Sequence, residues 1–232
     1  MKGTPTIRAG GWSLILGALA FMGVFGYLAA RFNYPDILDG TAAEVLPRLL
    51  ATGATGRAVW ALYALLPLIW IPAGAGAYLV YRRHHPGSML IAMQCAFLSA
   101  FSMMLGLMRW PSIHWRLAEL HATADEGQRA TIDALFDGLN TYLGNYIGEF
   151  VGELAFSAFF LLSAWAMLRS RTAPRAIAVA GLVTGAAGMI GMFRNITLVV
   201  APVADINNYL LPLWMIVFGV VLLRHREPAT AE

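Results

Sequence analysis

Long apolar stretches alternate with short polar loops along almost the whole chain. Five stretches run for 18 to 24 residues without a single Asp, Glu, Lys or Arg. A helix needs roughly 20 apolar residues to cross the hydrocarbon core of a bilayer, and in lipid the backbone must satisfy its own hydrogen bonds. The pattern therefore predicts transmembrane helices. A sixth stretch, about 143–168, contains two glutamates but has the same length.

These stretches define the predicted fold. We expect an all-α protein, a six-helix transmembrane bundle that forms a single integral-membrane domain over residues 1–232. The predicted spans are about 11–31, 58–81, 88–109, 143–168, 176–194 and 206–223.

Two of the longer loops carry the pattern of short amphipathic helices on the outer face. Thr41-Ala-Ala-Glu44 and Thr123-Ala-Asp-Glu126 both have the spacing of a capping box, which marks the start of a helix. Pro47 is awkward inside the first helix because it removes a backbone hydrogen bond, so that helix starts either at Thr41 or near Pro47. We expect the second helix to continue into the fourth span.

Composition and charge place the chain in a membrane. The sequence is 59% hydrophobic and 12% charged, whereas soluble domains are about a quarter charged. The formal charge of +3 does not indicate nucleic acid as a partner, because the basic residues mostly flank the spans. Both termini and two short loops are rich in Lys and Arg, which predicts a multi-pass protein of the plasma (inner) membrane with both termini in the cytoplasm.

The fourth span contains the strongest candidate for a site. Glu149 and Glu153 lie one helical turn apart, and Glu153 is roughly 24 Å along the helix from the inner boundary. Counted in the same way from the inner boundary, Glu149 and Arg194 lie roughly 28–30 Å along their helices. Arg109 ends the third span on the outer side. We therefore predict that two acids and two arginines share one layer in the outer leaflet.

Neighbouring residues of the fourth span extend this candidate site. Asn145 and, less closely, Tyr142 share the helical face of the two glutamates. Gly144, Gly148 and Gly152 form a stripe of small residues that would let another helix approach closely. The glutamates are therefore expected to face protein rather than lipid.

Three interpretations of this layer remain open. The first is a buried Arg–Glu network that only locks helix packing. The second is a polar cavity in which Glu153 binds a cation or a proton. The third is a metal site that adds His114 and His121, although their spacing matches no recognised ligand signature. We expect no cofactor, since the lone Cys95 and the absence of nucleotide-binding or catalytic motifs give no support for one.

Several short motifs resemble those of a known family. They are Phe32-Asn-Tyr-Pro-Asp-Ile-Leu, Glu44-Val-Leu, Arg109-Trp-Pro and Leu143-Gly-Asn-Tyr-Ile-Gly-Glu149. The chain resembles, over nearly its whole length, a bacterial integral-membrane family catalogued as domain of unknown function 4386. The resemblance implies a six-helix bacterial membrane protein and no particular activity.

The functional hypotheses follow from the layer of charged residues. The leading one is transport or binding of a small solute, an ion or a proton at this outer-leaflet site. The alternatives are a membrane sensor or regulatory subunit without catalysis, and a membrane-embedded metalloprotein or enzyme. We expect the lipid bilayer as the main partner, and the sequence leaves open a small solute or ion and a second copy of the chain.

Overall fold

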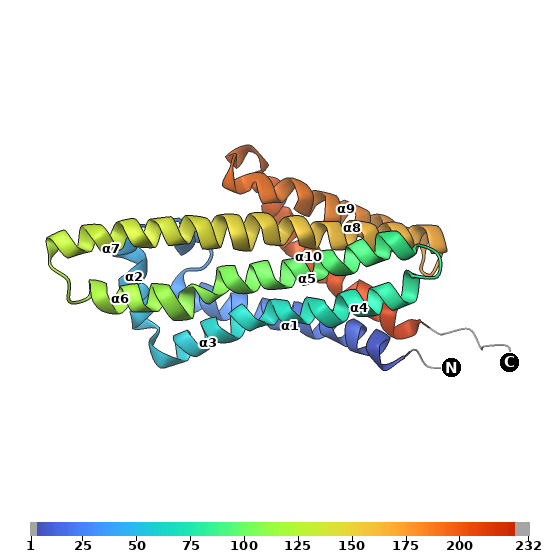
Figure 1. Cartoon of the computed structure of the whole chain (residues 1–232), viewed down its shortest axis with the longest axis horizontal. Helices are drawn as coiled ribbons and strands as arrows, with labels where there is room; N and C mark the ends of the chain where they lie inside the picture. Colours follow the sequence, from blue (N-terminus) through green and yellow to red (C-terminus); the bar gives the residue numbers. More distant parts are fainter. Residues whose placement is uncertain (1–3, 226–232) are drawn as a thin grey trace. The chain divides into compact units, whose positions relative to one another are not determined.

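In the computed structural model, which describes residues 4–225 with the exception of the Asp39 side chain, the chain is helical apart from short turns. Within these residues there is no strand, and six helices are long and apolar enough to cross a membrane (Figure 1). Each predicted span lies inside one of them. They are Pro5–Phe32, Gly53–Tyr81, Pro86–His121, Glu126–Ser170, Arg175–Asn195 and Leu198–Arg224. The predicted all-α fold with six long apolar helices is confirmed.

The helices divide further into α-, 3₁₀- and π-helical segments. The α-helices are α1 (Pro5–Phe32), α2 (Ala42–Ala51), α3 (Gly53–Leu65), α4 (Trp70–Tyr81), α5 (Pro86–Met108), α6 (Trp115–His121), α7 (Glu126–Leu139), α8 (Gly152–Ser170), α9 (Arg175–Gly191) and α10 (Ala201–Arg224). The 3₁₀ segments are η1 (Asp36–Asp39), η2 (Leu66–Ile69), η5 (Met192–Asn195) and η6 (Leu198–Val200). The π-helical segments are η3 (Trp110–His114) and η4 (Asn140–Val151).

The two amphipathic helices are present, as α2 and α7. Helix α2 follows Thr41, whose backbone N–H donates to the Glu44 carboxylate at 3.1 Å, and Pro47 lies inside the helix. Helix α7 begins later than its sequence pattern predicted. Its cap is Asp125, which accepts from the backbone N–H of Gln128 at 2.9 Å. The prediction of a cap at Thr123 was wrong, because an aspartate two residues later satisfies the first free amides of the helix.

The chain divides into two compact units. Unit 1 consists of Met1–Leu19, Pro67–Phe101 and Phe150–Glu232, and unit 2 consists of Ala20–Leu66 and Ser102–Glu149.

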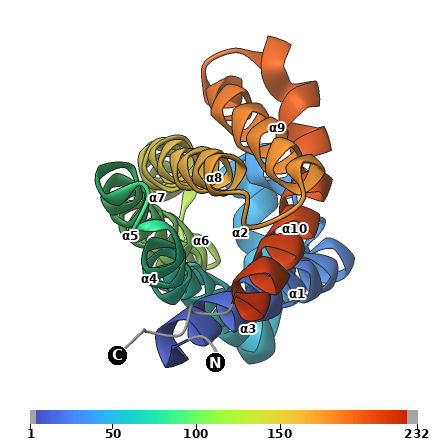
Figure 2. The same cartoon turned by 90° about the vertical axis from the view of Figure 1, so that its right-hand side faces the viewer.

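Unit 1 is built on α8, α9 and α10, with α8 packed against α9 and α9 against α10 (Figure 2). Small residues bring these helices together. Gly181 of α9 lies directly against the indole ring of Trp214 in α10, where a side chain of its own would clash. Trp214 in turn stacks on Phe218, with ring centroids 5.6 Å apart. Close approach and aromatic packing replace the hydrophobic driving force that is missing between helices in lipid.

Unit 2 is built around an aromatic core. Trp60 of α3 stacks on Trp110 of η3 at 4.8 Å, and Phe32 meets both rings edge-on. Helix α2 covers this core with Val45, Leu46 and Leu49, which are fully buried. The aromatic rings therefore join α1, α3 and η3 within this unit.

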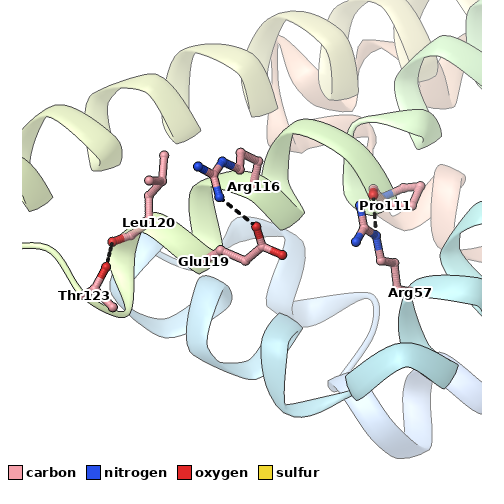
Figure 3. A network of polar contacts seen from close by, with 6 residues as sticks. All are labelled: Arg57, Pro111, Arg116, Glu119, Leu120 and Thr123. Carbon is pink, nitrogen blue, oxygen red and sulfur yellow. Dashed lines mark hydrogen bonds and ion pairs between the residues drawn. The ribbon is translucent and has the colours of Figure 1, made fainter.

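Arginine side chains join the helices at the edge of this core. The Nε of Arg57 in α3 donates to the carbonyl of Pro111 at 3.0 Å (Figure 3). The Arg57 guanidinium also lies 5.2 Å from the ring centre of Trp115. Arg116 and Glu119, also drawn there, form an exposed pair at 3.1 Å. The Pro111 carbonyl, which lies in the π-helical segment η3, thus accepts a hydrogen bond from Arg57 of the neighbouring helix α3.

The glycine stripe of the fourth span has the packing role that its spacing predicted. Gly148 of η4 faces Gly106 of α5 so closely that a Cβ on Gly106 would lie 2.5 Å from the Gly148 Cα and 2.9 Å from the Leu143 carbonyl oxygen. Both obstacles are backbone atoms, which no side-chain rotation can move. Only two glycines allow this crossing.

Replacing Gly106 with alanine is therefore expected to destabilise the protein. Overpacking of this kind costs about 1–3 kcal/mol, and denaturant titration of the protein in detergent micelles measures it. Gly26→Ala is the matched control, since nothing lies within 4 Å of a Cβ there. The control should stay within about 1 kcal/mol of the wild type, on the stabilising side. Equal stability of the two variants would contradict the close crossing.

Candidate functional site

In unit 2 the polar centre is Arg109, the last residue of the third predicted span. It is 5% exposed. Its Nε donates to Asn140 Oδ1 at 3.1 Å, its Nη1 donates to the Gly106 carbonyl at 2.6 Å, and its guanidinium lies 5.0 Å from the Trp110 ring centre. A buried cation is stable only when its donors are satisfied, so these partners hold the side chain in one position.

Two helix irregularities place this arginine and its partner. Pro111 has no backbone N–H to continue the α-helical ladder, and the His114 amide instead reaches back to the Arg109 carbonyl at 2.8 Å. This widened turn is η3. Asn140 starts the second π-helical segment, η4. Segments of this kind occur frequently at functional sites.

Asn140 joins three parts of unit 2. While its carbonyl oxygen accepts from Arg109, its amide Nδ2 donates to the backbone carbonyl of Leu38 at 3.2 Å. Gly144 lies one turn along the same helix, directly beneath the guanidinium, and a Cβ there would overlap it. The carboxylate of Glu149 is close enough to Arg109 to act on it electrostatically. The prediction that Glu149 and Arg109 belong to one layer of charged residues stays a prediction.

In unit 1 the polar centre is an ion pair between Glu153 and Arg194. Glu153 lies in the first turn of α8, and Arg194 lies in η5, which follows α9. The guanidinium donates from Nη1 to Oε2 at 2.6 Å and from Nη2 to Oε1 at 2.7 Å. This two-point geometry is the strongest form of an arginine–carboxylate contact. Both side chains are about a quarter exposed, at 26% and 27%.

Two further buried polar residues lie in unit 1. Ser157 lies one turn after Glu153 on α8, and Asn207 is on α10. Both are buried, and both lie beside Gly188, with Ser157 Oγ and Asn207 Nδ2 within 3.2 Å of where a Cβ on Gly188 would be. The carbonyl oxygen of Asn207 is buried without a hydrogen-bond partner among the described residues. A buried acceptor of this kind can receive a hydrogen bond or act as a ligand for a cation.

The four charged residues of the predicted site are divided between the two units. Arg109 and Glu149 belong to unit 2, and Glu153 and Arg194 belong to unit 1. Asn145 is half-buried, whereas Tyr142 is 62% exposed. The π-helical hydrogen bonding of η4 changes the number of residues per turn, so α-helical spacing does not describe its faces.

Sequence analysis missed three polar residues near these pairs. Asn140 has a detectable signal, because it lies one turn before the glycine stripe on a face that otherwise holds Gly144 and Gly148. Ser157 and Asn207 could have been noted as polar residues within apolar spans. Their convergence beside Gly188 depends on tertiary packing and has no signal in the sequence.

The two histidines of the metal interpretation have different surroundings. His114 is fully buried, with its ring 4.9 Å from Trp110 and 4.7 Å from Phe136, and neither ring nitrogen has a hydrogen-bond partner in the part of the chain that the structure describes. His121 pairs instead with Asp133 at 3.6 Å. Within the described part of the chain, no group of three or more His, Cys, Asp and Glu is placed to hold a metal ion.

Replacing Asn140 with alanine should lower the free energy of unfolding by about 2–3 kcal/mol, because it leaves a buried guanidinium N–H and the Leu38 carbonyl without a partner. Thr141→Ala, at the exposed neighbouring position, is the control and should change stability by no more than about 0.5 kcal/mol. Chemical denaturation in micelles measures both. Similar losses in the two variants would show that Asn140 does not hold Arg109.

Comparison with known proteins gives one match. No curated protein and no solved structure matches the chain. The family described as a domain of unknown function (DUF4386) matches residues 9–224, which include every motif that carried the resemblance in the sequence. Since the match covers nearly the whole sequence, the chain belongs to the DUF4386 family.

Proposed function

We propose that this multi-pass membrane protein binds a proton or a small cation at Glu153 and moves it between the two sides of the membrane. The observation that carries the proposal is the unpartnered carbonyl oxygen of Asn207, buried next to Ser157 on the helix that holds Glu153. An oxygen acceptor of this kind is a ligand for a hard cation or a hydrogen-bond acceptor for water.

Arg194 competes with the proton or cation for the Glu153 carboxylate. An ionised glutamate at the centre of a bilayer costs about 2.5–3.5 kcal/mol, which a partner must offset. In the observed state Arg194 supplies the compensating charge through two short hydrogen bonds. A proton or cation that binds Glu153 neutralises it and releases Arg194, so binding would switch the pair between a closed and an open arrangement.

Arg109 and Arg194 differ in how far they are exposed, and this difference supports different roles for them. Arg109 is 5% exposed and held by Asn140 and the Gly106 carbonyl, so it acts as a structural cation within unit 2. Arg194 and Glu153 are about a quarter exposed. A ligand can reach this second pair without unfolding the helices, and for this reason we place the exchange site there.

We also propose that the protein lies in a bacterial inner membrane with both termini in the cytoplasm. The support is the distribution of charge in the sequence: the loops between α4 and α5 and between α8 and α9 carry arginines without an opposing acid. Positive residues of short loops are retained on the cytoplasmic side.

The transport function predicts that Glu153→Gln abolishes flux. Liposomes that contain the full chain and a trapped pH-sensitive dye would be driven by a potassium diffusion potential, with and without a sodium gradient. Wild type should change the internal pH or carry sodium, and Glu153→Gln should not. Glu119→Gln, which removes an acid from an exposed surface pair, is the matched control and should behave as wild type.

A second variant separates function from stability. Asn207→Leu removes the unsatisfied oxygen, so it should leave the free energy of unfolding unchanged or raise it, because an apolar replacement needs no partner. It should nevertheless lower the flux. Wild-type flux in both Glu153→Gln and Asn207→Leu, with normal folding, would exclude this function.

A second candidate function is a sensor or regulatory subunit, and helix length favours it. Pro86–His121 and Glu126–Ser170 have 36 and 45 residues, whereas about 20 are enough to cross the hydrocarbon core. The surplus residues form α6 and α7 of unit 2, and we infer that these two helices lie outside the lipid. A wild-type protein without any flux, recovered from native membranes with a stoichiometric partner, would favour this function over transport.

A further inference from the structure

A basic cavity lies in unit 1, far in sequence from the Glu153–Arg194 pair. It is open, has a volume of about 930 Å³, and lies where α4 gives way to α5 and α8 gives way to α9. Five of its lining residues are basic: His84, His85, Arg169, Arg171 and Arg175. Among the described residues that line it there is no acid.

Contacts between the two loops shape this cavity in advance. The Thr172 hydroxyl donates to the Tyr81 hydroxyl at 3.2 Å and thereby joins the end of α4 to the loop after α8. The ring of His85 packs on that of Trp165 with centroids 4.6 Å apart. Two independent contacts therefore fix the histidine side of the cavity relative to the arginine side, so a ligand would not have to order both loops.

The charge of the cavity is uncompensated within the described residues. None of the five basic side chains forms a hydrogen bond or an ion pair there, in contrast to Arg109 and Arg194, which both donate hydrogen bonds. Arg169, Arg171 and Arg175 are exposed. Helix α9 begins at Arg175 and has no acid in its first turn, so the partial positive charge of its N-terminus adds to that of the arginines.

Depth in the membrane identifies the ligand. Tyr81 and Ser170 end spanning helices, and Arg175 begins one, so the cavity lies at the level of the lipid headgroups. Trp165 stands beside it, as tryptophans do at membrane interfaces. Guanidinium groups match the oxygens of a phosphate in geometry and charge. We propose that this cavity binds the phosphate-bearing head of an anionic phospholipid.

Lipid retention tests the proposal. The purified full chain would be mixed in detergent with phosphatidylglycerol, with phosphatidylcholine or with inorganic phosphate, and native mass spectrometry would count the bound molecules. Wild type should retain phosphatidylglycerol, and neither phosphatidylcholine nor inorganic phosphate at the same concentration should displace it. Displacement by inorganic phosphate would overturn the lipid assignment in favour of a free phosphate.

A matched pair of triple variants locates the site. R169Q/R171Q/R175Q should bind phosphatidylglycerol at least about tenfold more weakly, because each arginine near the membrane surface attracts an anionic headgroup. R48Q/R116Q/R129Q removes the same charge from exposed positions of unit 2 and should bind as wild type does. Circular dichroism melting confirms that both variants fold. Equal binding by the two variants, whether strong or weak, would overturn the proposal.

Discussion

The absence of water inside a bilayer governs this structure, because every polar group in a spanning helix must find its partner in the protein. Arg109 and Arg194 meet this requirement in different ways. Arg109 is enclosed and bonded to neutral groups, an amide oxygen and a backbone carbonyl. Arg194 is paired with a full carboxylate and remains partly exposed. The first arrangement favours rigidity, and the second allows exchange.

Small residues and helix irregularities make both arrangements possible. Glycines at positions 106, 144 and 148 let the third and fourth spans approach until a guanidinium fits between them. Pro111 interrupts the α-helical ladder and opens a π-helical turn beside Arg109. In unit 1, Gly188 leaves room for two polar side chains from neighbouring helices. Packing with so few side-chain atoms explains how an apolar sequence can enclose charges without large distortions.

The sequence predicts the helices well and the site only in part. Spans follow from the length of the apolar runs, and the close crossing follows from the spacing of Gly144 and Gly148. The cap of α7 was assigned to Thr123 rather than Asp125 because both residues fit the capping pattern. The roles of Asn140 and Asn207 depend on partners far away in the chain, such as the Leu38 carbonyl, and local spacing holds no information about them.

The central claim is that charged groups in the spans are stabilised by partners within the protein, and a double-mutant cycle between Glu153 and Arg194 tests it most directly. The free energy of unfolding would be measured in micelles for wild type, Glu153→Gln, Arg194→Gln and the double variant. For the observed two-point contact the account predicts a coupling of about 1.5–3 kcal/mol. Additive single effects, with a coupling near zero, would contradict it.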